Sequence, residues 1–324
     1  MNENAYPEYR WRERGQGESV LLLHGLMGQI DHWESSVQTL GEISRAIALE
    51  LPIFHPALPE ASIAELRRYV RSFLKALEIP RAVVGGNSLG GHVALELTLT
   101  HPERVSGLIL VGSSGLFERG YTRGVPHRPS SEYVREKMRE IFYDPALVTP
   151  GWVEEVRRVV TAPSSAMRVL RFARDAKHHK LEERLPHICV PTLLVWGKED
   201  RITPPEVAQR FHALIRTPGW FSSHTAATSR CSNGRTLLTV WSERGSRKRA
   251  AAARGGKPRR EPCDDRPGGR LVAPGIRAAQ APRAGGRLAA CRSGSGDDPA
   301  SARREGAGHG VRAGPRVQPH PLRG

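Results

Sequence analysis

The feature that most constrains this chain is the segment RAVVGGNSLGGHVALELTLTHP, residues 81–102. A short apolar run leads into closely spaced glycines around Ser88, and apolar residues at helical spacing follow. Residues 86–90 fit the pattern G-x-S-x-G, which places a serine on a sharp turn between a strand and a helix. Gly86 and Gly90 leave room for that turn, so the segment indicates a nucleophilic serine. The alternative is an ordinary glycine-rich loop or an anion site.

The rest of the first two thirds alternates strands and helices. The segment 63–79 repeats apolar residues at helical spacing and ends before Pro80. Short continuous apolar runs, typical of strands buried on both faces, occur at 19–25, 45–52, 105–115 and 190–200. This alternation predicts an α/β fold with a mostly parallel, doubly wound sheet.

Three motifs in this order resemble the α/β-hydrolase family, in its form with a serine nucleophile and a helical cap. The resemblance covers residues 19–215. HGLMG at 24–28 is similar to that family's oxyanion loop, and GGNSLGGHVAL at 85–95 is similar to its nucleophile elbow. PTLLVWGKEDRITPP at 191–205 is similar to the strand and turn that present its catalytic acid.

The resemblance implies a role for each matching residue. Ser88 attacks a carbonyl carbon, and Asp200 orients the catalytic histidine. The backbone N–H groups of Leu26 and Leu89 form the oxyanion hole, with Met27 as the alternative to Leu26. The family acts on small-molecule substrates by this chemistry without a cofactor or a metal.

Some motif residues have plainer readings. His24 is expected to support the loop that begins with Gly25 rather than to transfer protons. Asp200 read without the resemblance is a solvated turn acid or a helix cap. ELPIFHPALPEAS at 50–62 replaces the family's DLPGxGxS, which bears on the shape of the pocket.

Four regions follow from these patterns. The cap region is charged and predicts two helices, at 131–142 and 152–160, with His178 and His179 expected on the surface near its end. The predicted regions are the first part of the core at 1–116, the cap at 117–186, the second part of the core at 187–215 and a low-complexity tail at 216–324.

The catalytic base is the weak part of the resemblance. The family carries it in a GHxP sequence after one more strand, about 25 to 35 residues beyond the acid. His224 lies 24 positions after Asp200, but the surrounding SSHTAATS shows neither a strand pattern nor a loop glycine. We therefore expect the last strand and the last helix to be missing, with His224 as the substitute candidate base.

A shifted reading frame accounts for this loss. Deleting one base from a proline codon after Ile215 gives Ile-Arg-Thr, the sequence at 215–217. Synonymous codons for the following residues can be chosen so that the alternative frame encodes a strand, a GHxP loop and the start of a helix. We interpret 216–324 as an out-of-frame, disordered tail.

The charge distribution supports that boundary. Residues 216–324 hold 22 of the 49 Lys and Arg residues but 7 of the 33 Asp and Glu residues, and so carry +15 of the net charge of +16. The rival interpretation is an RNA-binding or interaction arm, although SRKRAAAARGGKPRREP lacks aromatic residues for stacking on bases. Salt-sensitive RNA binding that disappears when the tail is deleted would support it.

Cysteine use and hydropathy bear on location. Cys189 is the only cysteine before residue 216, so no disulfide can form within 1–215, which is typical of a reducing compartment. The three tail cysteines lack metal-ligand spacing, and no apolar run is long enough for a membrane span. We expect a cytoplasmic protein of undetermined oligomeric state.

The expected activity is hydrolysis of a small or medium carboxyl ester through an acyl-enzyme, impaired in this chain by the missing base. Serine at the elbow argues against haloalkane dehalogenases and epoxide hydrolases, which use aspartate there. The GNSxGG elbow is also similar to that of hydrolases that cleave C–C bonds in ring-cleavage dienoates, which is the alternative within the fold.

Overall fold

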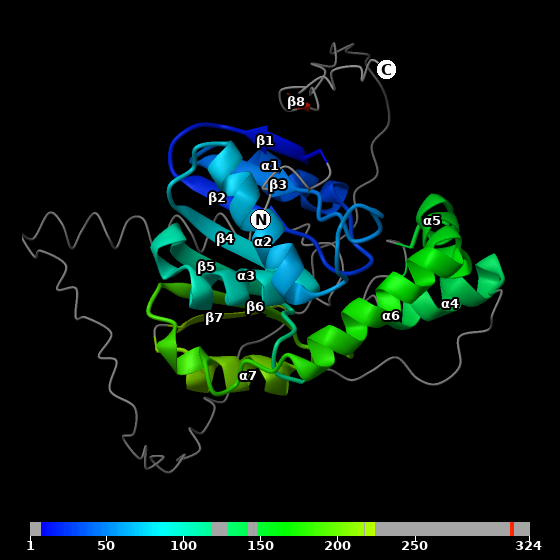
Figure 1. The fold of residues 1–324 in the computed structure, drawn as a ribbon. Helices are drawn as coiled ribbons and strands as arrows, with labels where there is room; N and C mark the ends of the chain where they lie inside the picture. The colour runs from blue at the N-terminus through cyan, green and yellow to red at the C-terminus, as the bar shows by residue number, and fades with distance from the viewer. Residues whose placement is uncertain are drawn as a thin grey trace, which may run out of the picture. The chain divides into compact units, whose positions relative to one another are not determined.

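The computed structural model describes residues 8–117, 129–141, 145, 148–216, 218–223 and 312–313. An eight-stranded sheet runs through this described part in the order β7-β6-β5-β4-β2-β3-β1-β8 (Figure 1). Its strands are β1 Arg10–Arg14, β2 Ser19–Leu23, β3 Arg45–Leu49, β4 Ala82–Asn87, β5 Val105–Val111, β6 Thr192–Gly197, β7 Pro218–Ser223 and β8 Arg312–Ala313.

The centre of the sheet is parallel. Strands β3, β2, β4, β5, β6 and β7 pair in parallel, while β1 is antiparallel to β3 and β8 is antiparallel to β1. Every residue of β4 and of β6 is buried, as expected for strands covered by helices on both faces. The predicted α/β architecture is confirmed.

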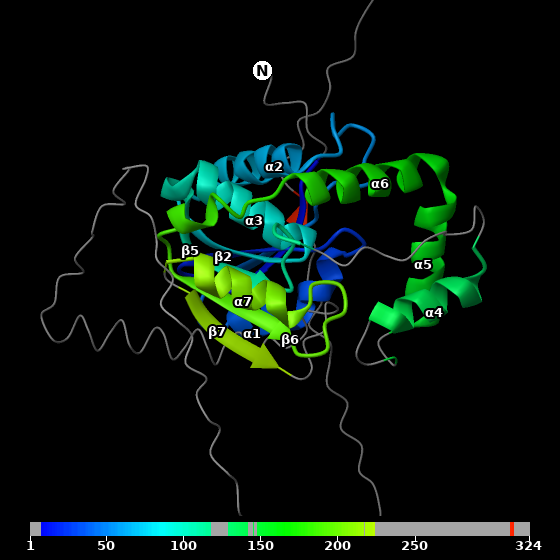
Figure 2. The ribbon, with the colours of Figure 1, turned by 90° about the horizontal axis from the view of Figure 1, so that it is seen from below.

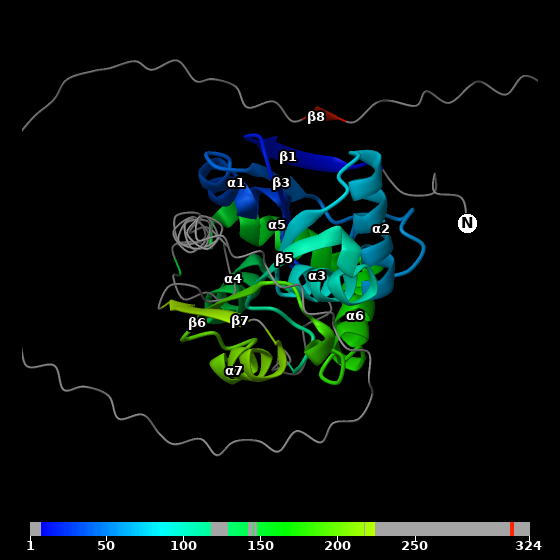
Figure 3. The ribbon, with the colours of Figure 1, turned by 90° about the vertical axis from the view of Figure 1, so that its left-hand side faces the viewer.

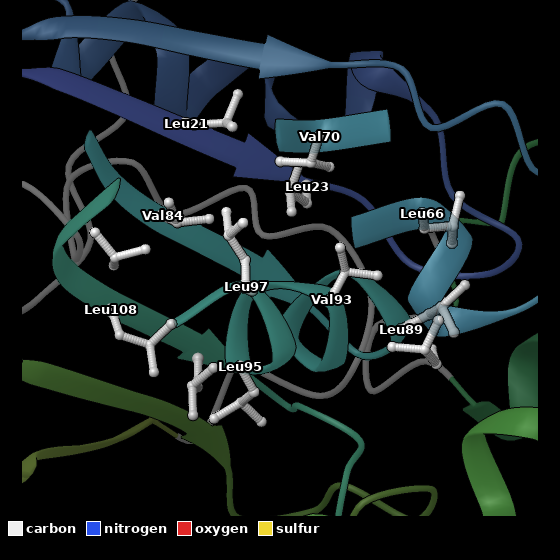
Figure 4. Packing of buried hydrophobic residues seen from close by; sticks show 14 of the residues in the cluster. Leu21, Leu23, Leu66, Val70, Val84, Leu89, Val93, Leu95, Leu97 and Leu108 are labelled. Carbon is white, nitrogen blue, oxygen red and sulfur yellow. The ribbon is translucent and has the colours of Figure 1, made fainter. Parts of the chain in front are cut away.

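Helices cover the two faces of the sheet. Helix α1 (Glu34–Leu40) lies on one face, and α2 (Ile63–Ala76) and α3 (Leu89–Thr100) lie on the other (Figure 3). Successive residues of β2 alternate between the faces, so that Leu21 and Leu23 join the larger core cluster with α2, α3 and α7 (Pro205–Leu214). Figure 4 shows Leu21 and Leu23 of β2 together with Val70 of α2 within this cluster.

The segment between β5 and β6 contains three helices in its described part, α4 (Ser131–Ile141), α5 (Pro150–Thr161) and α6 (Pro163–His178). The sequence predicts the first two and misses α6. Figure 2 shows α6 beside α2 at one end and close to α5 at the other. Helices α4 and α5 share an apolar cluster of their own. This arrangement is that of a helical cap.

Helix α6 contacts residues 50–62, the segment whose sequence departs from the family's DLPGxGxS. Arg168 donates from Nε to the carbonyl oxygen of Ile53 at 2.8 Å, and its terminal nitrogens lie 3.3 and 3.4 Å from the carbonyl oxygen of Leu58. Asp175 accepts the backbone N–H of Ile63 at 2.7 Å, at the start of α2. The cap is thus fixed to the core by charged groups that bind backbone atoms.

The sheet extends beyond the point where the sequence predicts that it stops. Strand β7 follows α7 directly and pairs in parallel with β6, from Thr192 opposite Pro218 to Gly197 opposite Ser223. The expectation of a missing last strand is therefore wrong. Strand pairing uses backbone N–H and C=O groups at the free edge of β6, so it does not require the side-chain pattern on which the prediction relied.

Two further observations concern the cysteines and the apolar character of the helices. Cys189 is disulfide-bonded, and since residues 1–215 contain no second cysteine, the expectation that no disulfide forms within that range still holds. The other three cysteines of the chain lie outside the described residues. Within the described ranges, no helix combines the length and the apolar character that a membrane crossing requires.

Candidate active site

Ser88 occupies the turn between β4, which ends at Asn87, and α3, which begins at Leu89. Its backbone angles are φ +51° and ψ −116°, a combination that residues with a side chain rarely adopt. Such a conformation costs about 1–3 kcal/mol and persists only where the surroundings enforce it. Strain of this kind is concentrated at functional sites.

The glycines of the motif make this turn possible. A Cβ atom on Gly86 would collide with the backbone carbonyl of Gly90. A Cβ atom on Gly90 would collide with the carbonyl oxygen of Leu23 and lie 2.6 Å from that of His24. The chain therefore approaches itself more closely at these two positions than any side chain allows.

The backbone of Ser88 is held on both sides. Its N–H donates to the carbonyl oxygen of Val111 at 3.1 Å. Its carbonyl oxygen accepts the backbone N–H of His92 at 3.1 Å, and both the backbone N–H and the hydroxyl of Ser114 at 3.2 Å. Neither His92 nor Ser114 has a role predicted from the sequence, although His92 follows the elbow glycines and Ser114 lies in the apolar run at 105–115.

His24 is buried below the loop that follows β2. Its Nδ1–H donates to the carbonyl oxygen of Gly25 at 2.9 Å, and its Nε2 accepts the backbone N–H of Leu51 at 2.9 Å. Burial lowers the pKa of His24, against a smaller opposing effect of Glu50. These contacts keep the ring neutral and occupy both nitrogens, as the expected loop support requires.

The loop and the elbow lie against each other. A Cβ atom on Gly25 would lie 3.0 Å from Oδ1 of Asn87 and 3.4 Å from Cβ of Ser88. Leu89 is the first residue of α3, so its N–H has no intrahelical acceptor. Leu26 follows Gly25 and is half-buried. Both proposed oxyanion donors therefore belong to segments that adjoin Ser88.

Asp200 lies in the turn after β6 and is buried. Its Oδ1 accepts the backbone N–H groups of Ile202 and Thr203 at 2.9 and 2.8 Å, and its Oδ2 accepts the hydroxyl of Thr203 at 3.0 Å. Three donors stabilise the carboxylate and fix its orientation. Because β4, β5 and β6 are parallel neighbours, Asp200 and Ser88 follow strands that end at the same edge of the sheet.

The candidate substitute base directly follows β7 in the chain, a strand that the sequence does not predict. Strand β7 ends at Ser223, opposite Gly197, the last residue of β6. His224 is the next residue and lies outside the described residues. The sequence objection that no strand precedes His224 is removed, and its position relative to Ser88 stays a prediction.

The two histidines near the end of the cap differ. His178 is exposed and contacts the carbonyl oxygen of Arg174 at 2.7 Å through Nδ1. His179 is half-buried and lies 3.2 Å from Nε2 of His92, so the expectation that it is a surface residue is wrong. Across the described ranges, no group of three His, Cys, Asp or Glu side chains converges as a metal site.

A family model described as "alpha/beta hydrolase fold" matches residues 18–225. The chain is 32% identical over 214 residues to the dihydrolipoyllysine-residue acetyltransferase component of the acetoin cleaving system of Pseudomonas putida, a match that covers 62% of this chain and 57% of that protein. It is 28% identical over 218 residues to 2-hydroxy-6-oxo-6-phenylhexa-2,4-dienoate hydrolase of Comamonas testosteroni, covering 60% of this chain and 75% of that protein.

Among solved structures, the fold is similar to MGS-MChE2, an alpha/beta hydrolase enzyme from the metagenome of sediments from the lagoon of Mar Chica, Morocco. That chain is 27% identical, with a TM-score of 0.59, over 74% of this chain and 97% of its own length. The present chain spans little more than half of the Pseudomonas relative, at 57% of its length.

Proposed function

Because this chain belongs to the alpha/beta hydrolase fold family, we propose that it is a serine hydrolase that cleaves a small carboxyl ester through an acyl-enzyme. The observation that carries the proposal is the backbone of Ser88, held at φ +51° between β4 and α3. A strand-to-helix turn of this geometry lifts a serine hydroxyl above the end of the sheet, where a substrate carbonyl can reach it.

The first half of the reaction forms the acyl-enzyme. Ser88 Oγ attacks the carbonyl carbon while a histidine base accepts the hydroxyl proton. The carbonyl π electrons move to oxygen, which accepts hydrogen bonds from the N–H groups of Leu26 and Leu89. The C–O bond to the alcohol then breaks, and the histidine returns the proton to the leaving oxygen.

The second half releases the acid. Water attacks the acyl carbon, the histidine accepts its proton, and the bond to Ser88 Oγ breaks as the proton returns to Oγ. Each oxyanion donor is worth about 2.7–4 kcal/mol of transition-state stabilisation in comparable sites. Asp200, fixed by its three hydrogen bonds, orients the histidine and stabilises its charged form.

The base limits turnover in this chain. His224 is the candidate, since it follows β7 in the chain, but the sequence around it lacks the glycine loop that normally presents the imidazole. A serine without a well-placed base is a weak nucleophile. We infer that Ser88 reacts far more slowly here than in a hydrolase with an intact triad.

A C–C bond hydrolase is the second candidate within the fold. It is favoured by the elbow sequence GNSLGG and by the 28% identical relative from Comamonas testosteroni, whose name describes cleavage of a phenyl dienoate. The departure at 50–62 and its contacts with Arg168 shape the region between core and cap, but they do not distinguish the two substrates.

A paired substrate assay tests the proposal. The purified chain is offered p-nitrophenyl butyrate and 2-hydroxy-6-oxo-6-phenylhexa-2,4-dienoate, with Ser88→Ala as the control. Slow ester hydrolysis that Ser88→Ala abolishes supports the esterase, and preference for the dienoate supports the alternative. Hydrolysis that persists in Ser88→Ala, or a Ser88 that a fluorophosphonate never labels, overturns both.

A further inference from the structure

A chain of polar groups connects the end of the cap to the elbow. Ser114 donates its hydroxyl to the carbonyl oxygen of Ser88 at 3.2 Å, and Nδ1 of His92 lies 3.4 Å from that hydroxyl oxygen. Nε2 of His92 lies 3.2 Å from Nδ1 of His179, the residue that directly follows α6. His92 is fully buried, whereas His179 is half-buried.

The hydroxyl hydrogen of Ser114 is directed at the carbonyl oxygen of Ser88, and from this contact we assign a direction to each of the other hydrogen bonds. A serine hydroxyl has one hydrogen, and the carbonyl oxygen of Ser88 can only accept it. Ser114 Oγ therefore faces His92 as an acceptor, so His92 carries its proton on Nδ1 and accepts at Nε2. His179 must then donate from its own Nδ1. Every bond in the chain donates toward Ser88.

At His179 this series of polar groups meets the ion pair between Glu96 of α3 and Arg184. Nε2 of His179 lies 3.7 Å from Oε2 of Glu96, which also accepts Nη1 of Arg184 at 2.7 Å. Glu96 lies one turn after His92 on α3, and Arg184 belongs to the segment that returns from the cap to the core. The backbone N–H of Leu181 adds a bond to the carbonyl oxygen of Gly115 at 2.9 Å. The returning segment is thus held against both α3 and the segment that follows β5.

We propose that His92 and His179 are positioning residues that tie the end of cap helix α6 to the carbonyl group of Ser88 through Ser114, an inference that rests on the proposed role of Ser88. Seating of the cap then fixes the elbow, and loosening of the cap releases one of the donors that hold the strained backbone of Ser88.

The alternative is a buried histidine that serves packing alone. Burial, reinforced by the nearby His179, lowers the pKa of His92 to about 3, so the ring stays neutral and keeps one acceptor and one donor. The two rings are inclined by only 8°, with centroids 5.2 Å apart. An apolar side chain would fill this space without the desolvation cost of an imidazole. The polar ring is therefore best explained by the bonds that it makes on both sides.

We call the hydrogen-bonded series His179, His92, Ser114 and Ser88 the relay. Amide hydrogen exchange tests it without requiring any catalysis. The amides of His92 and Ser114 both donate to Ser88, and in His179→Ala we expect their exchange to accelerate at least tenfold relative to amides of α1, on the other face of the sheet. His179→Asn can donate from its side-chain amide and should restore protection. The adjacent, exposed His178→Ala is the matched control and should change nothing. Unaltered exchange in His179→Ala overturns the proposal.

Two further measurements complete the test. Histidine ¹⁵N spectra of the wild-type chain should show His92 neutral, with its proton on Nδ1, between pH 5 and 8. A proton on Nε2 instead would overturn the relay. This measurement uses the wild-type chain, so it decides the question even if His179→Ala does not fold. Fluorophosphonate labelling of Ser88 should slow at least tenfold in His179→Ala and recover in His179→Asn. If the wild-type chain is not labelled at all, the proposed function fails, while hydrogen exchange and the spectra still decide the relay.

Discussion

Ser114 donates two hydrogen bonds to a single acceptor, since its backbone N–H and its hydroxyl both lie 3.2 Å from the carbonyl oxygen of Ser88. The unfavourable backbone conformation of Ser88 is therefore held from outside its own turn, by the segment that follows the neighbouring strand β5. Strain that is imposed from outside remains when the side chain that suffers it is changed. It can be measured by substitution at position 88.

Ser88→Gly is expected to raise the free energy of unfolding. Glycine adopts φ +51° without the Cβ penalty, and this relief exceeds the greater chain entropy that glycine gives the unfolded state. We expect a gain of about 1 kcal/mol in urea denaturation, accompanied by loss of all Ser88 chemistry. Ser88→Ala keeps the Cβ atom and should show no such gain. A Ser88→Gly variant less stable than Ser88→Ala contradicts this account of the strain.

Gly90→Ala is expected to destabilise the fold by about 2 kcal/mol or more, within the range for backbone strain and overpacking. The new Cβ atom would collide with the carbonyl oxygens of Leu23 and His24, and neither backbone can move without disturbing the elbow. Gly151→Ala provides the control, because a Cβ atom there meets nothing within 4 Å. It should be neutral or stabilising by up to about 1 kcal/mol. Equal effects of the two substitutions would show that the close approach at Gly90 is not real.

The stability of the chain should fall on mild acidification. Burial lowers the pKa of both His24 and His92 below 6.5, to about 3 for His92. Below pH 6.5 the unfolded state therefore binds more protons than the folded state. Each histidine then removes at most about 1.4 kcal/mol per pH unit as the pH falls from 6.5 toward its folded pKa, and stability is complete above 6.5. Urea denaturation between pH 7.5 and 5.0 measures this slope, before most carboxyl groups titrate.

Substitution of His92 measures how much this residue contributes to the change in the free energy of unfolding with pH. In His92→Gln the dependence on pH between 6.5 and 5.0 should become shallower by about 1 kcal/mol per pH unit. His55→Gln, which replaces an exposed histidine in the same way, is the comparison variant. A wild-type curve that is flat over this interval would mean that neither buried histidine is held neutral.

The sequence predicts those features of the fold and the site that depend on neighbouring residues, and it misses those that depend on contacts between residues far apart in the chain. The strands and the elbow were predictable because apolar runs and glycine spacing record what each segment does locally. Helix α6 was missed because it buries only Phe172 and Ala176 and so shows little apolar period. The bond between His92 and His179 joins residues 87 positions apart, and no local pattern encodes it.

Substitutions of Asp200 can separate its effect on the free energy of unfolding from its effect on the reactivity of Ser88. In Asp200→Asn the amide oxygen can still accept the N–H groups of Ile202 and Thr203, and the amide nitrogen can donate to the hydroxyl oxygen of Thr203. We expect unfolding free energy within about 1 kcal/mol of wild type, together with strongly reduced labelling of Ser88. Asp200→Ala should instead leave two backbone donors unsatisfied and cost about 2–3 kcal/mol. Normal labelling in Asp200→Asn would exclude this residue as the acid of the triad.

The reading frame after Ile215 yields the last prediction. Strand β7 pairs with β6 through backbone atoms, so its presence does not require the side chains that a hydrolase normally carries there. Coding DNA around codon 216 is expected to contain an uninterrupted alternative frame that encodes a strand followed by GHxP. Restoring that frame by one base should raise the rate of fluorophosphonate labelling of Ser88 by several powers of ten, because a triad without its base loses activity on that scale. Ser88→Ala in the restored chain should abolish labelling. Absence of the alternative frame, or a restored chain that reacts no faster, would leave His224 as the working base and refute the shift.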